Sequence, residues 1–176
     1  MPEPNVTYIK YLIGLSQKGR KNSFLKLCEL NLNKVFAICG LCLGDVKIAE
    51  EVAKDVFLSA WHNLKFVRED TSVNSWLRGI AVFEIMEELR TRERRQRVYP
   101  NAKKFDSTVY NRVHTNNQFE STILELPELE RTIFVLHDVE GYDFDEIAGF
   151  FDDLSIDEIK KIIRTTRASL VGIDIQ

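Results

Sequence analysis

Apolar side chains recur at helical spacing along most of this chain, and the clearest case lies in residues 73–97. There Leu77, Ala81, Ile85 and Leu89 follow one another every fourth residue. Because such spacing places side chains on one face of a helix, we expect this face to pack into a core. The same periodicity predicts further helices over residues 7–17, from residue 22 or 23 onwards, over 33–43 and over 45–61.

The helix predicted over residues 73–97 carries a second apolar face. Trp76, Ile80 and Phe83 also recur at helical spacing, but they project from nearly the opposite side. Aromatic rings stack on unpaired bases and guanidinium groups neutralise phosphates, so aromatic residues followed by arginines favour a nucleic-acid interface. Alternatively, the aromatic residues pack against another helix and the arginines form a solvated helix end. The arginines are Arg90, Arg92, Arg94, Arg95 and Arg97.

The C-terminal part predicts a helix-turn-helix. Helix restarts near Phe119 and ends at Gly141, which is placed as a C-cap. Asp143 with Glu146, and Ser155 with Glu158, have the spacing of capping boxes, which predicts a short helix and then a longer one to residue 170. A basic face on the longer helix suits entry into a DNA groove, although a plain helical hairpin with a solvated basic face fits equally well. That face consists of Lys160, Lys161, Arg164 and Arg167.

A polar segment that includes Pro100 lacks apolar periodicity, and we interpret it as a linker. We therefore expect an all-α protein with two small helical domains, residues 1–96 and 119–176, joined by residues 97–118. Residues 1–118 hold 19 Lys and Arg against 13 Asp and Glu, a net charge of +6, whereas residues 119–176 hold 5 against 14, a net charge of −9. This asymmetry favours two functional parts, of which the basic one suits nucleic acid.

The sequence contains no glycine-rich phosphate loop, paired-histidine site or nucleophile elbow, so we expect neither enzymatic activity nor a cofactor. Cys39 and Cys42 form a CxxC within an apolar helical run, without a second pair to complete a zinc site. Core packing is the simpler interpretation, and we expect no metal; a helical metal protein using these cysteines and a histidine is the alternative. The absence of an export signal and of an apolar run long enough for a bilayer predicts a cytoplasmic protein without a membrane span.

Three motifs carry a resemblance to a known family. They read GDVKIAEEVAKDVFLSAW at residues 44–61, SVNSWLRGIAVFEIMEELRTRERR at 72–95 and LPELERTIFVLHDVEGYDFDEIAGFF at 126–151. In this order they resemble a sigma-70 family RNA polymerase sigma factor of the small extracytoplasmic-function (ECF) type. The first two are similar to the family's region two, and the third is similar to the start of region four and its entry into the helix-turn-helix.

The resemblance implies an alternative sigma factor that binds core RNA polymerase and directs promoter recognition and transcription initiation. Region two would recognise and open the minus-ten element of promoter DNA, and region four would read the minus-thirty-five element. The resemblance also implies an anti-sigma factor as a further partner. Polymerase contacts would come from Glu51, Lys54, Asp55 and Leu58; minus-ten contacts from Lys65, Arg68, Asn74, Ser75, Trp76, Arg78, Phe83, Arg90 and Arg94; and minus-thirty-five contacts from Ser155, Glu158, Lys160, Lys161, Arg164 and Arg167.

Three departures from the family pattern alter these expectations. Phe83 stands where the family usually has an asparagine, so the preferred minus-ten sequence is expected to differ, and Phe83 either extends a stacking platform or fills core. Lys54 replaces a frequent glutamine. Asp157 and Glu158 open the recognition helix and Ile162 takes a position that is often arginine, which predicts weak or narrowly selective minus-thirty-five binding. A second interpretation therefore stays open, in which a sigma-like regulator binds protein partners without promoter readout.

Overall fold

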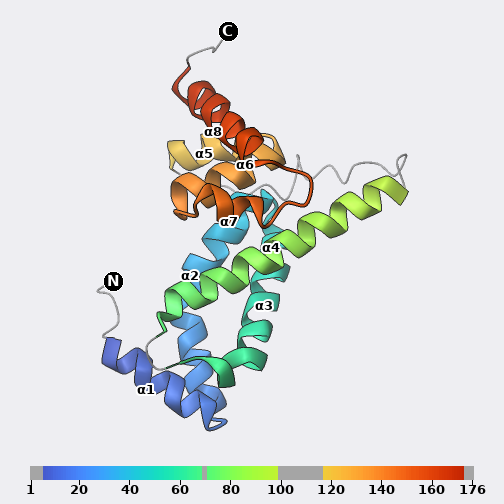
Figure 1. Ribbon diagram of the computed structural model, residues 1–176. Helices are drawn as coiled ribbons and strands as arrows, with labels where there is room; N and C mark the ends of the chain where they lie inside the picture. The colour runs from blue at the N-terminus through green and yellow to red at the C-terminus, as the bar shows by residue number, and fades with distance from the viewer. Residues whose placement is uncertain (1–5, 69–70, 99–116, 173–176) are drawn as a thin grey trace. The chain divides into compact units, whose positions relative to one another are not determined.

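The computed structural model describes residues 6–68, 71–98 and 117–172, and every regular element within these residues is a helix (Figure 1). The predicted all-α fold is therefore confirmed. The predicted linker falls almost entirely on residues 99–116, which lie outside the described residues. The helices are α1 (Val6–Gln17), α2 (Lys21–Leu43), α3 (Val46–Asn63), the 3-10 turn η1 (Leu64–Phe66), α4 (Val73–Val98), α5 (Gln118–Glu125), α6 (Glu128–Phe134), the π-helical turn η2 (Val135–Val139), α7 (Phe144–Ala148) and α8 (Ile156–Val171).

The chain separates into two compact units. The first contains the described residues of 1–39 and 47–102, and the second contains those of 40–46 and 103–176. Most of α2 and all of α1, α3 and α4 thus belong to the first unit, whereas α5 to α8 belong to the second. Within the described residues, no helix is both long and apolar enough to cross a bilayer.

The helix α2 corrects one prediction. The sequence suggested two helices with a break near Asn31 to Asn33, but a single helix runs from Lys21 to Leu43. Asn31 is buried, and its side-chain amide donates to the carbonyl oxygen of Leu27 at 2.7 Å. Because the buried amide finds this partner one turn back along the same helix, it does not interrupt the backbone ladder.

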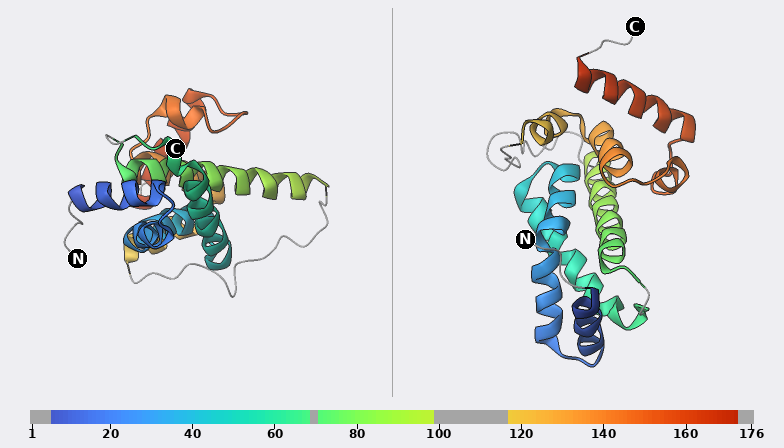
Figure 2. Two further views of the ribbon diagram at one scale, coloured as in Figure 1. Left: turned by 90° about the horizontal axis from the view of Figure 1, so that it is seen from below. Right: turned by 90° about the vertical axis from the view of Figure 1, so that its left-hand side faces the viewer.

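The helix α4 buries the face that its periodicity predicted. Leu77, Ala81 and Ile85 are buried, as are Val82 and Met86, while Leu89 is half-buried where the packed part of the helix ends. Beyond it the helix continues to Val98 and stands clear of α1 to α3, as Figure 2 shows. One side of α4 is therefore fixed by core packing.

The second unit is organised around α8, which packs against α6 and α7. Both predicted capping boxes are present: Asp143 with Glu146 opens α7, and Ser155 with Glu158 opens α8. Gly141 ends the preceding helical segment with a φ of +76°, a left-handed conformation that glycine adopts without strain. The predicted short helix, turn and longer helix are thus confirmed.

Replacing a buried and an exposed residue of α4 separates its two faces. We expect Ile85→Ala to lower the free energy of unfolding by about 2–5 kcal/mol, because the truncation leaves a cavity in a closely packed core. Phe83 is 60% exposed, so Phe83→Ala should change the same quantity by no more than about 0.5 kcal/mol. Urea unfolding followed by circular dichroism measures both. Equal decreases from the two substitutions would show that Phe83 is a core residue.

Candidate nucleic-acid interface

One exposed stripe runs along the face of α4 opposite the core. Positions 76, 80, 83, 87, 90 and 94 fall on the same side of an α-helix, since each step is three or four residues. Trp76 and Ile80 are half-buried and Phe83 is exposed, which decides between the two roles open to it. Phe83 does not fill core; it lies on the surface beside Trp76.

Acidic residues partner the arginines at the C-terminal end of this stripe. Arg90 Nη1 lies 2.9 Å from Glu87 Oε1, and Arg94 Nη2 lies 4.0 Å from Glu87 Oε2. Exposed pairs of this kind contribute little to stability, so a phosphate can take the place of the carboxylate at small cost. Arg90 and Arg94 therefore remain candidates for phosphate contact, with Glu87 as an internal competitor that the sequence analysis did not single out.

The remaining predicted minus-ten residues do not all share this stripe. Lys65 and Arg68 are exposed just after α3, and Ser75 is exposed in the first turn of α4. Asn74 and Arg78 flank Trp76 at a spacing of two residues, which places them on the far side of the helix from it. The structure thus brings Trp76, Phe83, Arg90 and Arg94 onto one face and leaves Asn74 and Arg78 off it.

A second exposed stripe lies on α3 and contains all the predicted polymerase contacts. Glu51, Lys54, Asp55 and Leu58 are exposed and follow one another at helical spacing, while Val52 and Val56 on the other side are buried. Leu58 is 57% exposed among charged neighbours. An apolar side chain ringed by charges of both signs suits a protein partner, because it combines desolvation with electrostatic complementarity.

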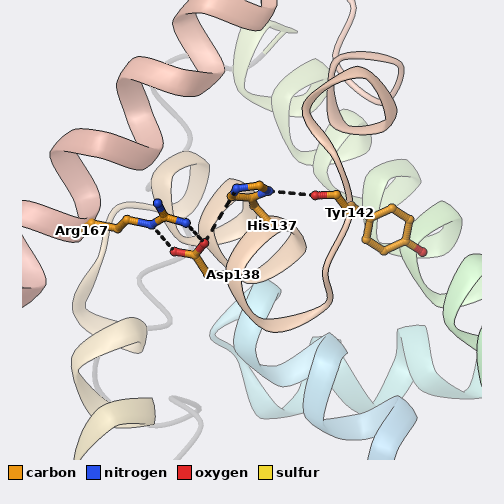
Figure 3. A network of polar contacts seen from close by, with 4 residues as sticks. All are labelled: His137, Asp138, Tyr142 and Arg167. Carbon is orange, nitrogen blue, oxygen red and sulfur yellow. Dashed lines mark hydrogen bonds and ion pairs between the residues drawn. The ribbon is translucent and has the colours of Figure 1, made fainter.

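Arg167 of α8 takes part in a network of polar contacts (Figure 3). Its guanidinium group donates to both carboxylate oxygens of Asp138, with Nε 2.8 Å from Oδ2, and this pairing raises the pKa of Arg167. His137 Nδ1 lies 2.8 Å from the carbonyl oxygen of Tyr142, which can only accept, so this nitrogen carries the proton. Arg167 thereby ties α8 to η2, a role that helical periodicity could not reveal because its partner lies 29 residues away.

The first turn of α8 uses two predicted DNA contacts as a cap. Glu158 Oε2 accepts from the backbone nitrogen of Ser155 at 2.8 Å and from its hydroxyl at 2.6 Å. The side-chain hydrogen bond from Ser155 is the main reason that the pKa of Glu158 lies below its usual value. Lys160 Nζ lies 5.5 Å from the centre of the Phe144 ring. Lys161 and Arg164 are exposed on the outward side of α8, which makes them its best placed candidates for phosphate contact.

The cysteines are placed for packing. Cys39 and Cys42 are fully buried, and burial raises the pKa of the Cys39 thiol to about 12. A neutral thiol is a poor metal ligand. Within the described parts of the chain, no group of three or more His, Cys, Asp or Glu side chains could hold a metal ion.

The arginines of α4 can be tested through salt dependence. We expect Arg90→Ala and Arg94→Ala each to weaken binding to DNA of any sequence and to lower the slope of log affinity against log salt by about one unit for each phosphate that the variant no longer neutralises. Lys26→Ala, which removes an exposed cation paired with Glu29 on α2, is the matched control and should leave the slope unchanged. Fluorescence anisotropy over a salt series measures the slope. Unchanged slopes in the arginine variants would show a solvated helix end.

Arg164 and Arg167 provide a matched pair on α8. Arg164→Ala should weaken duplex binding and leave stability unaltered, because its side chain points outward. Arg167→Ala should lower the free energy of unfolding by up to about 1 kcal/mol, since it breaks the pairing with Asp138. Thermal unfolding and a duplex-binding titration on both variants separate the two roles. If Arg164→Ala alone destabilised the fold, this assignment would be reversed.

Comparison with known protein families places both units. The family model for Sigma-70 region 2 matches residues 27–95, and the model for Sigma-70, region 4 matches residues 116–152. The chain is 24% identical over 172 residues to the ECF RNA polymerase sigma factor SigW of Bacillus subtilis, covering 88% of this chain and 84% of that one. It is 26% identical over 153 residues to the RNA polymerase sigma-H factor of Pseudomonas aeruginosa, covering 78% and 79% of the two chains.

Solved structures share the fold. CnrH, in complex with the cytosolic domain of CnrY, matches 94% of this chain and 96% of its own with a TM-score of 0.52 at 21% identity. The sigma factor RpoE of Bartonella quintana, in complex with the anti-sigma factor NepR, matches 86% of this chain and 98% of its own with a TM-score of 0.56 at 19% identity. The helical units, the two matched regions and these relatives agree: the chain belongs to the sigma-70 family, as an alternative sigma factor of the ECF type that directs transcription initiation.

Proposed function

We propose that this sigma factor recognises promoters mainly through region two, with the exposed stripe of α4 holding the melted non-template strand. The observation that supports this is the continuity of the stripe, in which Trp76, Ile80 and Phe83 lead directly to Arg90 and Arg94. Unpaired bases would stack on the aromatic part, and the backbone of the adjoining DNA would follow the arginines. Core RNA polymerase would dock on the α3 stripe of Glu51, Lys54, Asp55 and Leu58.

Phe83 sets the expected base preference apart from that of the family. An asparagine offers an amide that can donate to and accept from a base edge, whereas a phenyl ring offers only a face for stacking. Stacking tolerates many bases. We therefore expect a minus-ten element that is less strictly defined at the base that meets Phe83.

Region four contributes a weaker and more selective contact in this proposal. Arg167 is paired with Asp138, Glu158 caps its own helix, and the segment from residue 119 carries a net charge of −9. The region 4 family model ends at residue 152, before α8 begins. Lys161 and Arg164 would supply the phosphate contacts that remain.

The proposal includes an anti-sigma factor as a further partner, because both similar structures are complexes of this kind, CnrH with the cytosolic domain of CnrY and RpoE with NepR. Such a partner would compete with polymerase or DNA for the exposed stripes of α3 and α4. The protein would act in the cytoplasm, where core polymerase is, and would have no enzymatic activity of its own.

Run-off transcription with purified core polymerase over a promoter library tests the proposal. We expect a defined set of promoters to be transcribed only when the protein is added. Phe83→Asn should narrow the base preference at one position of the minus-ten element, because it restores an amide, without changing core binding. Sequencing of the transcribed templates measures the preference.

Leu58→Lys is the matched variant for polymerase docking. Because Leu58 is 57% exposed, the substitution should leave the fold intact but weaken core binding at least tenfold, as removal of a central apolar anchor does. If the unaltered protein bound core polymerase but no promoter were transcribed, the protein would instead be a regulator that binds protein partners without promoter readout.

A further inference from the structure

The turn η1 holds one aromatic side chain out of the first unit. Leu64 and Val67, on either side of it, are buried, whereas Phe66 between them is 71% exposed. The backbone nitrogen of Val67 donates to the carbonyl oxygen of Leu64 at 3.2 Å and closes the turn. Phe66 therefore projects from a turn that is anchored in the core at both ends.

A residue from a distant part of the chain fixes this turn. Gln17, the last residue of α1, donates through Nε2 to the carbonyl oxygen of Leu64 at 3.1 Å and to that of Val67 at 3.0 Å. The helix α1 packs against η1, so the amide reaches the turn from the body of the first unit. Two hydrogen bonds from one side chain, 47 and 50 residues away in sequence, limit how far the turn can move.

Cations accompany the exposed ring. Lys65 Nζ lies 4.8 Å from the centre of the Phe66 ring, within cation–π distance, and Arg68 is exposed two residues further on. A single exposed phenylalanine on a protein surface is ordinary. A ring held by a braced turn, with one face against an ammonium group and another cation nearby, has the composition of a single-strand stacking site.

We propose that Phe66 stacks on an unpaired base of the melted promoter strand, that Lys65 binds an adjacent phosphate, and that Gln17 is the positioning residue that keeps η1 in place. This inference rests on the proposed function of region two and adds a second aromatic contact to the stripe on α4. It also explains why the sequence tolerates an exposed Phe66 in a turn whose neighbours are buried.

Binding of DNA by holoenzyme, reconstituted from core polymerase and the full chain, tests the stacking role. The probes are a duplex with a central mismatched bubble and the same duplex fully paired. Phe66→Ala should weaken bubble binding about tenfold and leave binding of the paired duplex unchanged, because only unpaired bases can stack. Phe66→Tyr and Phe66→Trp should retain bubble binding, whereas Phe66→Leu should behave like Phe66→Ala.

The salt dependence separates stacking from charge. Phe66→Ala should leave the salt slope as it is, while Lys65→Ala should lower it by about 0.7 unit, the value for one phosphate of a single strand. Tyr11→Ala on α1 is the matched control, because Tyr11 is an exposed aromatic residue (62%) outside η1, and bubble binding should not change.

A double-mutant cycle tests the positioning role of Gln17. Gln17→Glu keeps the size of the side chain but replaces the donor with a carboxylate facing two carbonyl oxygens. It should weaken bubble binding in the wild-type background and have no further effect in the Phe66→Ala background. Equal weakening in both backgrounds would show a general structural role and overturn this part of the proposal.

The outcomes distinguish the inference from the function it rests on. If wild-type holoenzyme does not prefer the bubble to the paired duplex, both the stacking role of Phe66 and the proposed function of region two are overturned. If it prefers the bubble and Phe66→Ala does so equally, only the role of Phe66 is overturned. Weakened binding with Phe66→Ala that Phe66→Leu restores would show apolar packing and contradict stacking.

Discussion

Burial of one face of α4 determines where its opposite face can point. Leu77, Ala81 and Ile85 are held in the core, and a helix is too stiff to rotate one turn independently of the next. Trp76, Phe83, Arg90 and Arg94 are therefore displayed on one line, although none of them contributes to that core. The interface with nucleic acid depends on apolar packing that involves none of its own residues.

Arginines of similar sequence context take different roles in the two units because their acidic partners differ in position. Glu87 lies within one turn of Arg90 on the same exposed helix, so the pair is local and open to exchange with phosphate. Asp138 lies in η2 and holds Arg167 of α8 by two hydrogen bonds. The first arrangement leaves positive charge accessible, and the second uses it to join two elements.

The acidic character of the second unit also has a structural basis. Glu146 and Glu158 each complete a capping box, which satisfies backbone N–H groups at the start of α7 and α8. Acidic residues in the first turn also favour the helix dipole. Part of the charge that disfavours DNA therefore stabilises the helix-turn-helix, so the recognition helix combines a well-defined fold with few cations that face outward.

Much of this protein was determined by its sequence. Local rules sufficed for the helices, the two capping boxes, the glycine that ends η2 and the buried stripe of α4, because each depends on residues within a few positions of one another. The motifs were enough to indicate the family. The break expected in α2 was wrong because a buried Asn31 donates to Leu27, a local bond that composition alone did not reveal.

Tertiary structure decided what depends on distant partners. The exposure of Phe83, the pairing of Arg167 with Asp138 and the bracing of Phe66 by Gln17 each require knowledge of which segments meet in space. Periodicity specifies the face on which a side chain lies. Whether that face meets solvent, a carboxylate or the carbonyl oxygens of another turn follows only from the packing of elements that are far apart in the chain.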